Sequence, residues 1–178
     1  MVKGGITNIC SNVIDRYVEA EKGNKIVVYW EGNDPGFDGC LTYNELLMKV
    51  CQLSNYLKDI GVKKGDAVAI YFPMLAELPI AMFACARIGV VHSVVFAGFL
   101  AESLAQRIIH HKPKALLICN DVRQGAKVIN LKEIVDSALV ESSKNGVSVG
   151  MRLQLSILFA PILFLLVDPS NIEGLSLW

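Results

Sequence analysis

Hydrophobic residues recur along the chain at two different spacings, and each spacing predicts a different kind of element. After Thr42, apolar residues fall every three or four positions as far as Ile60, which is the period of an amphipathic helix. Thr42 and Glu45 have the spacing of a capping box, and Gly61 stands where a left-handed residue commonly ends a helix. Residues 67–72 are instead almost continuously apolar. The pattern therefore predicts a capped helix followed by a strand that is buried on both faces of a sheet.

The same reasoning extends over the chain up to about Gly150. A turn rich in Gly, Asp and Pro is expected at 32–39. The other expected elements are a short helix capped by Thr7 with Ile9, Val13, Ile14 and Tyr17 on its inner side, strands at 25–31, 90–96 and 115–119, and helices at 77–88, 102–111 and 132–142. Strands that alternate with helices through short connections form a βαβ pattern. The sequence thus predicts an α/β fold, in which a partial, layered parallel sheet is flanked by helices.

The composition changes after Gly150, and three interpretations of residues 151–178 remain open. The segment is strongly apolar, with Arg152, Asp168 and Glu173 as its only charges. A membrane span is disfavoured because the apolar run is short and contains Pro161. The segment could be a buried strand or helix of a complete fold. The abrupt change favours the third interpretation, in which residues 1–150 form one domain region and 151–178 an unrelated apolar tail.

Charge and cysteine content narrow the possible functions. Seventeen basic residues balance seventeen acidic ones, so no basic surface for nucleic acid is expected. The five cysteines are scattered and show no C-x-x-C spacing, which favours reduced thiols over disulfides or a zinc site. The amino-terminal residues do not have the pattern of a secretory signal. A cytoplasmic location is therefore expected.

Two long segments resemble a known family. Leu41–Met74 (LTYNELLMKVCQLSNYLKDIGVKKGDAVAIYFPM) is followed at the expected separation by Ala81–Phe99 (AMFACARIGVVHSVVFAGF). Both resemble the N-terminal region of the AMP-forming acyl-CoA and acetyl-CoA synthetases, which belong to the adenylate-forming superfamily. The variants around Glu77-Leu78-Pro79-Ile80 and Ala97-Gly98-Phe99 are most similar to the plant acyl-activating branch. The resemblance covers the chain from about Thr7 to Gly150.

The resemblance implies a ligase reaction that uses ATP, Mg²⁺ and CoA. In such enzymes a carboxylic acid and ATP form an acyl-adenylate and pyrophosphate, and the thiol of CoA then displaces AMP. The first step requires a Ser/Thr/Gly-rich loop that ends in Lys, and this sequence contains no such loop. The chain is therefore expected to be an N-terminal fragment that is inactive alone. The alternative is a truncated, non-catalytic isoform or interaction module. Peroxisomal or plastid locations are implied for full-length relatives, and membrane association through the tail is not expected.

The resemblance also implies two contacts with CoA. Phe96, Ala97 and Gly98 match a turn that lines the path of CoA, and Arg123 and Lys127 match a basic turn that meets its 3′-phosphate end. A glycine lets a ligand approach the backbone, and a cation suits an exposed phosphate. Ordinary alternatives are a plain strand-to-helix turn and a solvated loop. The spacing downstream of Arg123 is one residue longer than in relatives, so Lys127 is the better-supported contact.

Other polar residues have structural interpretations. His92 lies within an apolar strand and is interpreted as a core histidine, while the pair His110-His111 suits a helix end. Asp15-Arg16 is interpreted as a pair on a helix surface. Leu100 stands where similar sequences have Ser as a helix cap. No catalytic residue and no metal ligand is assigned to this chain.

Overall fold

The computed structural model describes residues 7–32, 35–124, 127–155 and 164–167. The chain divides into two compact units, each made from two separate stretches of sequence. The first unit contains Met1–Asp66 and Leu75–His92, and the second contains Ala67–Met74 and Ser93–Trp178. Ala67–Met74, which belongs to the second unit, therefore lies in the sequence between the two stretches of the first.

The first unit is built around two helices, α1 (Tyr43–Asp59) and α2 (Glu77–Arg87), with an antiparallel pair of strands, β1 (Ile26–Glu31) and β2 (Asp38–Thr42). The predicted capping box is confirmed, because the Glu45 amide donates to Thr42 Oγ1 and the Thr42 amide donates to the Glu45 carboxylate at 2.7 Å. Gly61 follows the helix with a φ of 87°. The buried residues of α1 lie on one stripe that includes Leu46, Val50, Leu53 and Leu57. On the same side, the Ser54 hydroxyl donates to the Ala84 carbonyl and links α1 to α2.

The amino-terminal helix differs from the prediction. It winds as two π-helical turns, η1 (Ser11–Asp15) and η2 (Val18–Lys22). Cys10 and Ile14 are buried, whereas Ile9 is 62% exposed and Tyr17 is 40% exposed. The wider turns of a π-helix change which residues share a face, so the predicted inner side is confirmed at Ile14 and is wrong at Ile9 and Tyr17.

The start of this helix and its ion pair also differ from the prediction. Asn8, one residue after the predicted cap at Thr7, accepts a hydrogen bond from the Cys10 amide. Asp15 pairs at 2.8 Å with Arg87 at the end of α2, although the sequence suggested its neighbour Arg16. The helix is thus tied to a distant element of the same unit by side chains whose partners are 72 or more residues away.

The second unit is a five-stranded sheet with helices α3 (Ala101–His111) and α4 (Leu131–Lys144). The strand order is β4–β3–β5–β8–β9, where the strands are β3 (Ala67–Phe72), β4 (Val91–Phe96), β5 (Ala115–Cys119), β8 (Met151–Leu155) and β9 (Phe164–Val167). β3, β5 and β8 run parallel in continuous register. β4 also runs parallel to β3, because the backbone bonds Val91 to Asp66 and Ala97 to Phe72 keep one direction. The predicted α/β fold with a parallel sheet is confirmed.

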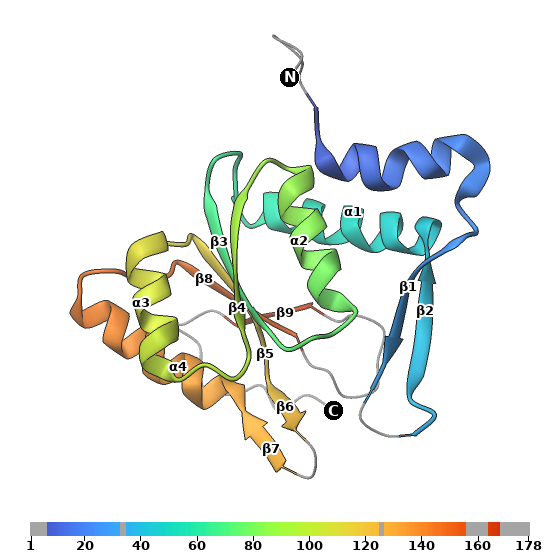
Figure 1. Ribbon diagram of the computed structural model, residues 1–178. Coiled ribbons are helices and arrows are strands. Elements are labelled where there is room, and N and C mark those ends of the chain that lie inside the picture. The colour runs from blue at the N-terminus through green and yellow to red at the C-terminus, as the bar shows by residue number, and fades with distance from the viewer. Residues whose placement is uncertain (1–6, 33–34, 125–126, 156–163, 168–178) are drawn as a thin grey trace. The chain divides into compact units, whose positions relative to one another are not determined.

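Helices α3 and α4 pack side by side against this sheet (Figure 1). β3 and β5 are the buried centre, and every residue of β5 is buried. Asn130 is the N-cap of α4, and its side chain accepts a bond from the Glu133 amide. Leu100 occupies the corresponding position of α3 and makes no side-chain capping bond.

Residues 151–155 form β8, beside β5. Leu153 is buried, and the buried Arg152 pairs with Asp136 of α4. The first residues after Gly150 therefore continue the sheet. Where family sequence gives way to another kind of sequence stays a prediction, because most of 156–178 lies outside the described residues.

Candidate functional site

The turn that follows β4 carries the first predicted contact. Phe96 ends the strand with half of its side-chain surface exposed, Ala97 is buried beneath the turn, and Gly98 is exposed. The Phe99 amide donates to the Phe96 carbonyl at 3.2 Å and closes the turn. A Cβ atom placed on Gly98 would meet only the Phe96 ring, at 3.4 Å, which is ordinary van der Waals contact. The fold itself therefore leaves room for a small side chain at Gly98, and the glycine keeps the outer side of the turn open.

Two hydrogen bonds tie this turn to β3. The Ala97 amide donates to the Phe72 carbonyl at 3.2 Å, and the Tyr71 hydroxyl donates to the Phe99 carbonyl at 3.0 Å. Tyr71 is completely buried. Burial raises the pKa of Tyr71, and a backbone interaction with Gly98 opposes this rise. Sequence reasoning missed Tyr71, although a single hydroxyl in the otherwise apolar strand AVAIYF is a detectable signal.

The second predicted contact lies on a two-stranded ribbon that begins two residues after β5. Its strands are β6 (Asp121–Gln124) and β7 (Lys127–Asn130), which pair antiparallel. Arg123 lies within β6 with its backbone opposite Val128, so it precedes the turn that the sequence predicted to contain it. Lys127 is the first residue of β7 and is exposed. Residues 125–126, at the predicted turn, lie outside the described residues.

The topology brings the turn after β4 and the ribbon of β6 and β7 to the same edge of the sheet, the one formed by the carboxyl ends of its parallel strands. β4 and β5 both neighbour β3 and run in its direction, so the residues that follow them leave at one edge. This is the edge at which ligands bind in open parallel α/β sheets. Figure 1 shows the ribbon of β6 and β7 extending beyond the end of β5 there. An exposed cation and a neutral, partly aromatic turn thus belong to one end of the second unit.

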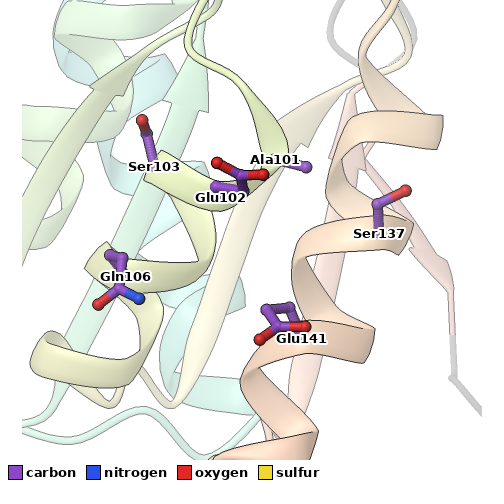
Figure 2. Close-up of a pocket in the computed structure, with 6 residues that line it drawn as sticks. All are labelled: Ala101, Glu102, Ser103, Gln106, Ser137 and Glu141. Carbon is purple, nitrogen blue, oxygen red and sulfur yellow. The ribbon is translucent and has the colours of Figure 1, made fainter.

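A cavity of about 690 Å³ lies between α3 and α4 (Figure 2). Its lining residues are Ala101, Glu102, Ser103, Gln106, Ser137 and Glu141. Figure 2 shows side chains from both helices around this space, and Glu141 pairs at 3.2 Å with Lys144. Two carboxylates and no lining cation make the cavity unfavourable for phosphate groups. It is therefore a poorer candidate for a nucleotide or for CoA than the sheet edge.

Two of the cysteine thiols are unsuited to act as nucleophiles. Burial raises the pKa of Cys85 to about 12 and that of Cys10 above its ordinary value, which disfavours the nucleophilic thiolates. Within the described ranges, no three His, Cys, Asp or Glu side chains are grouped so that they could hold a metal ion. No step through the Mg²⁺ that the resemblance implies is assigned to these residues. No helix in the described part of the chain has both the length and the apolar character to cross a membrane.

In many nucleotide- and cofactor-binding α/β proteins the ligand lies at the carboxyl edge of a parallel sheet, and this chain has such a sheet. Residues 15–156 match the family model described as AMP-binding enzyme. The chain belongs to this family. It is 68% identical over 151 residues to the chloroplastic/glyoxysomal acetyl-coenzyme A synthetase of Arabidopsis thaliana, covering 85% of this chain and 20% of that protein.

Two further acetyl-coenzyme A synthetases are similar to this chain at lower identity. The enzyme of Drosophila melanogaster is 49% identical over 149 residues, which is 83% of this chain and 22% of the relative. That of Bartonella quintana is 47% identical over 149 residues, which is 84% of this chain and 23% of the relative. The chain thus spans about a fifth of the length of the curated relatives that it matches.

Proposed function

We propose that this chain supplies the front part of the large domain of an AMP-forming carboxylic acid–CoA ligase and that acetate is the acid. The complete reaction converts acid, ATP and CoA into acyl-CoA, AMP and pyrophosphate through an acyl-adenylate. The observation that carries the proposal is the family match over residues 15–156, together with the 68% identity to a protein named as an acetyl-coenzyme A synthetase. The likeness to a chloroplastic/glyoxysomal relative supports a plastid or peroxisomal location over the cytoplasm.

Within this reaction, the role proposed for the chain is contact with CoA. The turn at Phe96, Ala97 and Gly98 has no charged side chain and leaves its glycine backbone open, which suits the neutral pantetheine arm. Lys127 offers an exposed ammonium for the 3′-phosphate. Arg123, in the preceding strand, is a secondary candidate for the same phosphate. The steps that use ATP are proposed to depend on residues outside this chain, so the chain alone is expected to lack ligase activity.

The assignment of Lys127 is tested by comparing CoA with dephospho-CoA, which lacks only the 3′-phosphate. Isothermal titration calorimetry of the chain with Lys127→Ala should show CoA binding weakened about five-fold, as expected for one exposed charge contact of about 1 kcal/mol. Binding of dephospho-CoA should not change. Lys63→Ala removes another exposed lysine, in the first unit, and serves as the matched control. Equal losses for both ligands would contradict the phosphate contact.

The turn is tested by adding volume at Gly98. Two variants, Gly98→Ala and Gly98→Val, are compared. The melting temperature of Gly98→Ala should be nearly unchanged, because the added Cβ would have ordinary contacts. Affinity for both CoA and dephospho-CoA should fall with the size of the added side chain. Unchanged binding of both ligands by Gly98→Val would remove the turn from the site.

The expected lack of adenylation by the chain alone has its own test. ATP–pyrophosphate exchange with acetate by the unmodified chain would contradict it.

A further inference from the structure

Tyr71 is the one polar side chain of β3, and it is completely buried. Burial of a hydroxyl without a hydrogen bond is unfavourable, whereas phenylalanine would fill almost the same volume without a polar atom. A tyrosine at this position is therefore favourable only if its hydroxyl finds a partner. That partner is the Phe99 carbonyl, 28 residues later in the chain and 3.0 Å away.

The bond from Tyr71 is one of three that hold the turn after β4. The Ala97 amide bonds to the Phe72 carbonyl, and the Phe99 amide bonds to the Phe96 carbonyl, both at 3.2 Å. Ala97 and Phe99 are thus anchored to two adjacent residues of β3. Gly98 lies between the two anchors with its outer side open. The buried strand consequently determines where the exposed backbone of the turn lies.

We infer that Tyr71 is a positioning residue for the CoA-contacting turn, an inference that rests on the proposed function. Tyr71 is too deeply buried to contact CoA, and it acts by restricting the backbone at Gly98 and Phe99 before the ligand arrives. A turn that is already ordered loses less conformational freedom when the pantetheine arm binds. Without the hydroxyl, the turn keeps its strand bond at Ala97 but loses the anchor on its far side.

The test is the full chain with Tyr71→Phe, measured in two ways. Native-state hydrogen exchange of the Phe99 amide, which bonds to the Phe96 carbonyl, should become about five-fold faster, which is the factor expected for one hydrogen bond. Affinity for CoA should fall by a similar factor. Ile70→Val, at the next residue of β3, provides a matched control, because it removes one buried methylene without touching the turn.

Two outcomes separate positioning from a general loss of stability. Faster exchange confined to the turn, with weaker CoA binding in Tyr71→Phe and not in Ile70→Val, supports the positioning role. Equal effects of the two substitutions, or unchanged exchange in Tyr71→Phe, would overturn it. Absence of CoA binding by the unmodified chain would instead remove the proposed function, while the exchange measurement would still decide whether Tyr71 holds the turn.

Discussion

At the scale of single residues, Leu100 is a position where the chain can be improved. It has the extended backbone of an N-cap residue before α3, its side chain is 72% exposed, and it makes no capping bond. Leu100→Asp should stabilise the chain by about 1 kcal/mol, because the carboxylate can accept a bond from the first turn and favours the helix dipole. Thermal unfolding should then occur about 2–4 °C higher. Leu100→Ala controls for loss of the exposed leucine, and an equal shift in that variant would contradict the capping explanation.

The carboxylate of Glu45, in the capping box of α1, makes part of the stability of the chain depend on pH. Hydrogen bonds from the Thr42 amide and hydroxyl lower the pKa of Glu45 below its ordinary value of about 4.5. Because the folded-state pKa is depressed, this contribution is present above that value and is lost as the pH falls through the lowered pKa. Melting temperatures should therefore decline more steeply below about pH 4.5 in the unmodified chain than in Glu45→Gln. Parallel pH profiles would contradict the linkage.

At the scale of elements, the sequence predicted well wherever the determinants were local. α1 could be predicted because its period, its capping box and Gly61 agree within one segment. The buried strands β3 and β5 could be predicted from continuous apolar runs. The amino-terminal helix was predicted, but its π-helical turns were not, because their side chains bond to partners such as Arg87 far along the chain. Periodicity carries no information about such distant contacts.

The strand β8 also could not be predicted from its own sequence, because distant partners specify it. Its five residues, MRLQL, are too few for their pattern to distinguish a strand from a helix. The structure specifies the strand through its parallel register with β5 and through the pair between Arg152 and Asp136. A buried arginine must face its partner, and a slip by one residue would move it to the other face of the sheet. Arg152 thus helps to select one register among several apolar alternatives.

The hydrogen bonds between the amino-terminal helix and α2 lead to a prediction about the stability of the amino-terminal helix. Arg87 donates two bonds to the Asp15 carboxylate and one to the Cys10 sulfur, and all three groups are largely removed from water. Arg87→Gln should cost about 2 kcal/mol, as expected for hydrogen bonds to charged groups. Limited proteolysis should then cleave residues 8–22 before the rest of the chain.

Arg16→Gln is the control for this prediction, since it removes the neighbouring cation that sequence alone pairs with Asp15. It should leave both stability and cleavage unchanged. A double-mutant cycle between Asp15→Asn and Arg87→Gln should show a coupling energy of about 1 kcal/mol or more. Strict additivity would indicate that the ion pair does not hold the helix.

At the scale of the whole molecule, the candidate site could be predicted only as separate segments. The resemblance pointed to Gly98 and Lys127, and the parallel sheet places both at one edge because β4 and β5 run in the same direction. The sequence shows the single hydroxyl of β3 that supports the turn, but the partner of that hydroxyl could not be predicted. Tyr71 reaches the turn across 28 residues of sequence, and no local pattern indicates which carbonyl a buried hydroxyl will find.

The interleaving of the two units predicts how the chain unfolds. β3 belongs to the second unit, yet the sequence enters it from α1 and leaves it toward α2, both in the first unit. Unfolding of either unit therefore releases the connections that hold the other, and we expect a single cooperative transition. Two buried thiols can report on this, because Cys85 lies in the first unit and Cys119 in the second.

Thiol labelling followed by mass spectrometry across a urea gradient would measure both cysteines at once. Cys40 is exposed and should react without denaturant, which makes it an internal control for the reagent. Cys85, whose pKa is raised to about 12 by burial, and Cys119 should both stay unreacted in the native state at pH 8. Because unfolding is expected to be concerted, both should become reactive at the same urea midpoint. Labelling of Cys119 at clearly lower urea than Cys85, or the reverse, would show that one unit unfolds independently despite the interleaved chain.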